Sequence, residues 1–97
     1  MKNDEKTQQI SRAKELVSLW QDGGIKFSAI VGVLSALIEM VEDDDGNLAS
    51  ILWEEWGALE EINADMIEGR LTDIPNQYKD MVQSKAILIP KLLAGAV

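Results

Sequence analysis

The sequence contains no cysteine and no histidine among its 97 residues. Without cysteine, no disulfide can hold the fold and no thiol chemistry can take place. Without histidine, the commonest general base and the commonest metal ligand of proteins are missing. The first ten residues contain no apolar stretch of the signal-peptide type, which favours a cytoplasmic protein. No motif with a catalytic spacing is present elsewhere, so the composition points to binding rather than to a reaction.

Lysine and arginine are absent from 43 consecutive positions, 27–69. That segment holds 11 of the 17 acidic residues, and all 9 basic residues lie outside it. The formal net charge of −8 is the opposite of what direct binding to nucleic acid or to an anionic membrane requires. Because segregated like charges cost folding stability, this arrangement suggests a surface that meets a basic partner.

Hydrophobic residues make up 46% of the chain, which is enough for one modest core. Their spacing predicts a single domain over residues 1–97, an all-α, compact bundle of four helices with short loops. The first helix is expected over about residues 4–21, with Asn3 or Asp4 as its cap and the Gly23-Gly24 pair at its end. Its apolar face consists of Ile10, Ala13, Leu16, Val17 and Trp20.

The second helix is expected from about residue 27 to residue 41. Its opposite side carries small residues, which predicts a neighbouring helix in close approach across them. The apolar run 25–41 is too short to span a bilayer, and Lys26 and Glu39 interrupt it, so no membrane insertion is expected. The apolar face consists of Phe27, Ile30, Val31, Leu34, Leu37, Ile38 and Val41, and the small residues are Ala29, Gly32, Ser35 and Ala36.

The third helix is expected over residues 47–70, with Asn47 as its N-cap and Gly69 near its end. Its predicted core face consists of Leu48, Ile51, Leu52, Leu59, Ile62 and Met66. On another side, four acids line up at helical spacing: Glu54, Glu61, Asp65 and Glu68. Trp53 and Trp56 lie on a third side. Glu55 falls within the core face, which predicts either a packed stem with a solvated head or a buried partner such as a lysine, Tyr78 or Asn63.

The fourth helix is expected to begin around Thr72–Pro75, with an early-helix proline. Pro90 lies inside its apolar pattern and predicts a kink or break near Ala86. The expected core positions are Tyr78, Met81, Val82, Ile87, Leu88, Leu92 and Leu93.

An acidic run joins the second helix to the third and comprises Glu42, Asp43, Asp44 and Asp45. It does not match a calcium-binding loop, because with Gly46 at loop position 6 the first and last ligand positions fall on Val41 and Leu52. All-helical nucleotide hydrolases that use Mg²⁺ need acids from two facing helices. Here the second helix offers only Glu39. We therefore expect no metal, no cofactor and no enzymatic activity.

In order and style of its helices, the chain resembles bacterial immunity proteins that neutralise nuclease toxins. The resemblance is to the helical colicin D immunity type and to similar proteins of contact-dependent inhibition. It rests on an apolar first helix, the turn that leads from Asp22 to Phe27, and the aromatic and acidic stretch 52–56. It implies a cytoplasmic inhibitor whose acidic surface fills the basic RNA-binding cleft of a ribonuclease toxin.

On this interpretation the protein binds a cognate basic toxin and occludes its active site, with Trp53 as an aromatic anchor. Packing of Trp53 against a neighbouring helix is the alternative for that residue. A helical adaptor that binds another basic protein is the alternative function, and the Mg²⁺-dependent hydrolase is a third. The expected contact residues are Glu42, Asp43, Asp44, Asp45, Trp53, Glu54, Glu61, Asp65 and Glu68.

Overall fold

The structure is a computed structural model that describes the backbone of residues 2–96 and the side chains of residues 5–95. Within that range the chain forms four helices and no strand: α1 (Lys2–Gln21), α2 (Phe27–Glu42), α3 (Gly46–Ile67) and α4 (Asn76–Ala96). The predicted all-α bundle is confirmed. The expected cap at Asn3 or Asp4 lies outside the described side chains.

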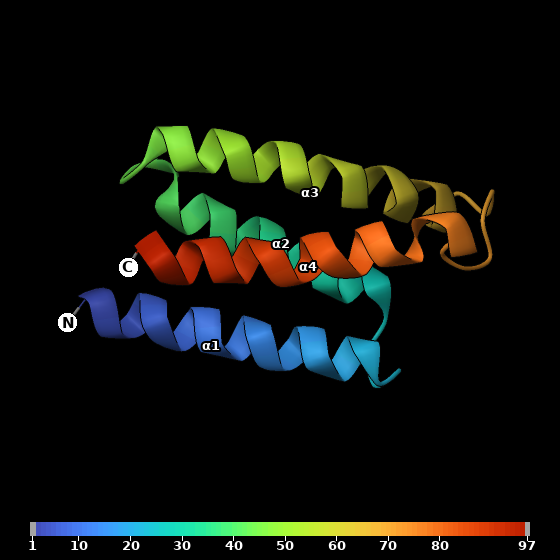
Figure 1. Cartoon of the computed structure of the whole chain (residues 1–97), viewed down its shortest axis with the longest axis horizontal. Helices are drawn as coiled ribbons and strands as arrows, with labels where there is room; N and C mark the ends of the chain where they lie inside the picture. The colour runs from blue at the N-terminus through green and yellow to red at the C-terminus, as the bar shows by residue number, and fades with distance from the viewer. Residues whose placement is uncertain (1, 97) are drawn as a thin grey trace.

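The four helices run alternately up and down, so that consecutive helices are antiparallel (Figure 1). α2 packs against α1, α3 and α4, and α4 also packs against α1 and α3. Among the described residues α1 and α3 do not pack against each other, which places them at opposite corners of the bundle. One long face of α3 is therefore left free of helical neighbours.

The core face predicted for α2 is confirmed, because all seven of its apolar residues are buried. The close neighbour expected across its small residues is not there. Ala29, Gly32 and Ala36 are exposed, and a Cβ added at Gly32 would meet no atom within 4 Å. α2 reaches its neighbours through large aliphatic side chains instead, and its small residues face outward.

On α3, three residues of the predicted core face are buried: Leu52, Leu59 and Ile62. Ile51 was also expected there, but it is 53% exposed, whereas Ala49 and Asn63 are buried in its place. The helix is thus rotated toward the side that carries Trp53 and Trp56. Both tryptophans pack against the core.

α4 is one continuous helix through Pro90, so of the kink or break expected near Ala86 the break does not occur (Figure 1). The helix begins at Asn76, which places Pro75 just before it rather than in its first turn. Asp73 does not cap it, since its carboxylate accepts the backbone N–H of Ile74. Tyr78 and Ile87 were expected in the core but are exposed, whereas Ala86, Ile89 and Pro90 are buried.

Glycines in the left-handed conformation end both α1 and α3. Gly23 has φ 84° and Gly69 has φ 81°. At each end the next residue returns a hydrogen bond to the last turn, Gly24 N–H to the Leu19 carbonyl and Arg70 N–H to the Asp65 carbonyl. This is the Schellman arrangement, which favours glycine, the residue without a Cβ, at the left-handed position. The predicted helix ends at these glycines are confirmed.

Candidate functional site

The acidic loop between α2 and α3 holds its side chains by separate local contacts. Asp45, and not Asn47 as expected, is the N-cap of α3, and its Oδ1 accepts the N–H of Leu48 at 3.0 Å. The carboxylate also lies at the helix end that favours negative charge. Asp44 forms an ion pair with Lys6 of α1. The loop is therefore tied to α1 on one side and to the start of α3 on the other.

The aromatic side of α3 closes a seam with α2. The indole N–H of Trp53 donates to Glu42 Oε1 at 2.5 Å, and that of Trp56 donates to the Val31 carbonyl at 2.8 Å. The two rings meet edge to face, with centroids 5.2 Å apart. Trp53 is half-buried and packs against the core. The alternative of packing against a neighbouring helix therefore applies to the buried part of this side chain. Its role as an anchor for a partner stays a prediction.

The four predicted stripe residues lie together on the outward face of α3. Glu54, Glu61 and Glu68 are exposed and Asp65 is half-exposed. Along an ideal helix, Glu54 and Glu61 are separated by about 10 Å, and Glu54 and Glu68 by about 21 Å. The stripe faces away from the buried residues Leu52 and Leu59. Its charges are therefore available to a partner without any change in the core.

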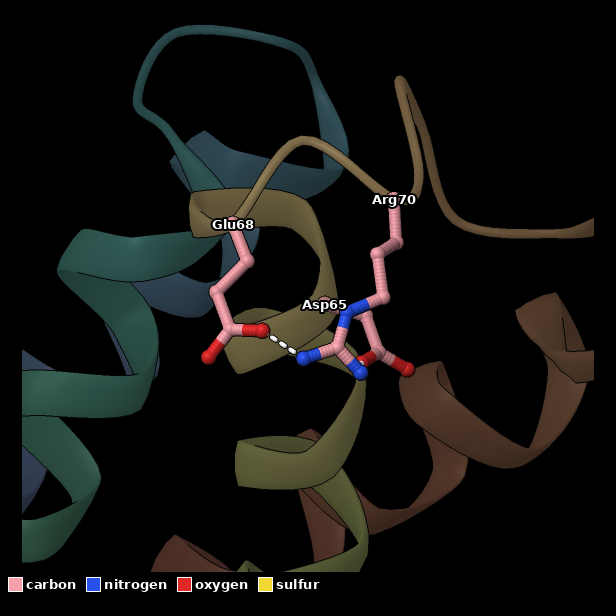
Figure 2. Close-up of polar contacts among 3 residues, drawn as sticks. All are labelled: Asp65, Glu68 and Arg70. Atoms are coloured by element: carbon pink, nitrogen blue, oxygen red, sulfur yellow. Dashed lines mark hydrogen bonds and ion pairs between the residues drawn. The ribbon is translucent and has the colours of Figure 1, made fainter.

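Arg70 offsets part of the negative charge at one end of this stripe. The left-handed Gly69 turns the chain back, and the guanidinium of Arg70 forms an ion pair with Glu68 and lies 3.5 Å from Asp65 Oδ1 (Figure 2). The segment without lysine or arginine ends at Gly69, and Arg70 follows it directly. Sequence reasoning did not anticipate that the turn would bring the cation onto the stripe.

Two further basic residues, one on α1 and one on α4, contact the acidic segment 27–69. Besides Lys6, which reaches Asp44, Lys85 of α4 pairs with Glu55 of α3. Both side chains of the second pair are about three-quarters buried, so of the alternatives stated for Glu55 the structure shows a partner, and that partner is a lysine. Among the described side chains, the acids of segment 27–69 without an ion-pair partner are Glu39, Glu42, Asp43, Asp45, Glu54, Glu60 and Glu61.

The predicted contact acids fall into a loop group and a stripe, and Trp53 adjoins the loop group because its indole donates to Glu42. The loop group, Glu42 to Asp45, lies at the corner where α3 begins, and the stripe runs from the middle of α3 to its opposite end (Figure 1). Glu54 and Glu61 are the two stripe members without a cation at hand among residues 5–95.

Neither a metal centre nor a membrane span is found in the described part of the chain. No group of three or more acidic residues there is placed to hold a metal ion. None of the helices over residues 2–96 combines the length and the apolar character needed to cross a bilayer. Comparison with protein-family models, curated proteins and solved structures finds no match for this chain.

Proposed function

We propose that this protein is an immunity-type inhibitor that binds a basic nuclease toxin, of the ribonuclease kind, in the cytoplasm and covers its active site. The observation that carries the proposal is the outward face of α3. There Glu54 and Glu61 are exposed, and no described cation lies within ion-pair distance of either. A cleft that binds RNA is lined with cations, and such a cleft is attracted by a row of fixed negative charges.

The geometry of the stripe favours individual ion pairs with a partner. Carboxylates about 10 Å apart along the helix are sparser than the phosphates of a duplex, of which each strand carries one per ~3.4 Å of helix axis. The stripe would therefore occupy selected cationic positions of the cleft rather than trace a whole backbone. It stands on a rigid helix, so little ordering entropy is lost on binding.

The contacts of Arg70 indicate which stripe residues should bind the partner most strongly. Because Asp65 and Glu68 already share a cation, a partner must compete with Arg70 for them. Glu54 and Glu61 need no such exchange, and we place the strongest contacts there. The loop group adds negative charge that steers the encounter, since long-range attraction acts mainly on the association rate.

The proposal is tested by binding kinetics against the product of the gene that lies next to this protein's own gene. Growth protection is measured together with the kinetics. Glu54→Lys with Glu61→Lys should weaken binding by several kcal/mol if the charges meet desolvated cations, and should abolish protection. Glu15→Lys with Asp80→Lys is the matched control, because it changes the net charge equally at exposed positions of α1 and α4. The control should chiefly slow association and leave protection in place.

Two outcomes would contradict the proposal. Equal losses in the α3 and control variants would mean that only the overall charge matters and that the α3 face is no binding site. Tight binding of the α3 face to a basic neighbour without nuclease activity would support the adaptor alternative instead. In both variants, circular dichroism should remain helical, since all four positions lie off the core.

A further inference from the structure

A pocket of about 480 Å³ lies at the end of the bundle where α1 turns into α2 and α3 leads toward α4. Its walls come from the end of α1, the start of α2, the last turns of α3 and the loop before α4. It is distant from the acidic loop, which lies at the other end of α3. A pocket of this volume falls in the range of clefts that bind small molecules.

The walls of this pocket are mainly aromatic and apolar. Trp20 and Phe27 stand side by side with ring centroids 5.5 Å apart and planes inclined by 35°. Met66 adds a thioether and Ile74 an aliphatic wall. Aromatic rings pack well against such surfaces through offset or edge contacts and through sulfur. The pocket therefore suits a flat, apolar group.

One buried polar side chain opens into this apolar pocket. Asn63 is only 6% exposed and is the one buried polar residue in the described chain. Its Nδ2 donates to Glu60 Oε2 over a long 3.5 Å, and its Oδ1 has no partner among the described residues. Every fully enclosed polar side-chain atom in that part of the chain is satisfied, so this oxygen must be reached by solvent. Because solvent reaches this oxygen, it is an acceptor that the donor of a ligand can take over from water.

We propose that this pocket binds an aromatic ring that carries one hydrogen-bond donor, such as an indole or a phenol. The ring lies against Trp20, Phe27 and Met66, and its N–H or O–H donates to Asn63 Oδ1. Lys26 and Asp73 stand at the pocket with opposite charges, so neither an anion nor a cation is favoured. The proposal does not depend on the toxin-inhibitor function, because none of its residues belongs to the acidic stripe.

Titration of the ¹⁵N-labelled protein with indole tests the proposal. The protein has three tryptophans, and each contributes one indole N–H resonance. Only Trp20 lines the pocket, so its resonance should shift on binding, whereas those of Trp53 and Trp56 should not. Tryptophan-to-phenylalanine variants assign the three signals. Saturable shifts at Trp53 or Trp56 alone, or no shift at any tryptophan, would overturn the assignment.

A second comparison tests the donor. 1-Methylindole keeps the ring and lacks the N–H, so it should bind about three- to tenfold more weakly than indole, as expected for one hydrogen bond. In Asn63→Leu, which removes the acceptor with little change in volume, the two ligands should bind equally. Asn47→Leu makes the same change at the far end of α3 and should keep the preference. A preference that persists in Asn63→Leu would rule out the role of Asn63.

If Asn63→Leu does not fold, Ser28→Trp keeps the proposal testable. Ser28 is exposed and lines the pocket, so a large ring there should block indole and 1-methylindole alike. Unchanged binding in this variant would show that the ring lies elsewhere. Comparison of indole with N-acetyltryptophanamide distinguishes the sources. Tighter binding of indole assigns the pocket to a free molecule, and tighter binding of the amide assigns it to a side chain of a polypeptide.

Discussion

Lys85 of α4 donates to Glu55 of α3 across the interface between the two helices, and both side chains are about three-quarters buried. The two residues are 30 positions apart in sequence. Glu54, the preceding residue, faces solvent without an ion-pair partner in the described chain. Two adjacent glutamates of one helix thus have different physical roles, one between helices and one on the free surface.

Glu55→Gln should lower the free energy of unfolding by about 1 kcal/mol, because it leaves the ammonium of Lys85, whose side chain is about three-quarters buried, without its counter-charge. Glu54→Gln is the matched control and should change stability by no more than about 0.5 kcal/mol. Urea unfolding measures both. A double-mutant cycle with Lys85→Met should assign the difference to the pair. Equal effects in the two single variants would contradict the interfacial role of Glu55.

Trp56→Phe should destabilise the protein more than Trp53→Phe does. Trp56 donates to the Val31 carbonyl in a part-buried position, and loss of that donor should cost about 1–3 kcal/mol. The bond from Trp53 to Glu42 is exposed, so water can replace it and the cost should stay nearer about 0.5–1 kcal/mol. Denaturant unfolding of the two variants gives the comparison. The reverse order would show that the seam between α2 and α3 is held by Trp53.

Asp45→Ala should lower the free energy of unfolding by about 1 kcal/mol, because it removes the side chain that caps α3. Asp45→Asn should be nearly neutral, since asparagine caps equally well. Asn47→Ala should leave stability unchanged or raise it slightly, because Asn47 lies inside the first turn and alanine is the better helix former. Thermal unfolding followed by circular dichroism checks all three. A larger loss at Asn47 than at Asp45 would restore the cap expected from the sequence.

Gly57→Ala and Gly69→Ala should have opposite signs. Gly57 lies inside α3 with open space where the Cβ of an alanine would stand, so alanine should stabilise the protein by about 0.5–1 kcal/mol. Gly69 has equally open surroundings but φ of 81°, so alanine should destabilise by about 1–2 kcal/mol through backbone conformation alone. Guanidinium unfolding curves decide the signs. Stabilisation by Gly69→Ala would mean that the Schellman end of α3 does not persist in solution.

The sequence by itself determined the number of helices and their ends at Gly23 and Gly69. It also determined the whole buried face of α2. These features follow from local physics, because helical spacing of apolar residues repeats within a few turns and a left-handed glycine acts on its own turn. The exposed acidic stripe was predicted on the same grounds, since four acids at helical spacing avoid the core wherever the helix is placed.

Only the tertiary structure decided how far α3 and α4 are rotated about their axes. The apolar residues of both helices cover more than one side, and the contacts with neighbouring helices determine which of these residues are buried. Ile51 and Ile87 lie outside, whereas Asn63 and Ala86 lie inside. The tertiary structure likewise decided which cations reach the acidic segment. Lys6 and Lys85 come from other helices and Arg70 comes from a turn. Such pairings depend on distances through space, and helical periodicity along the chain carries no information about them.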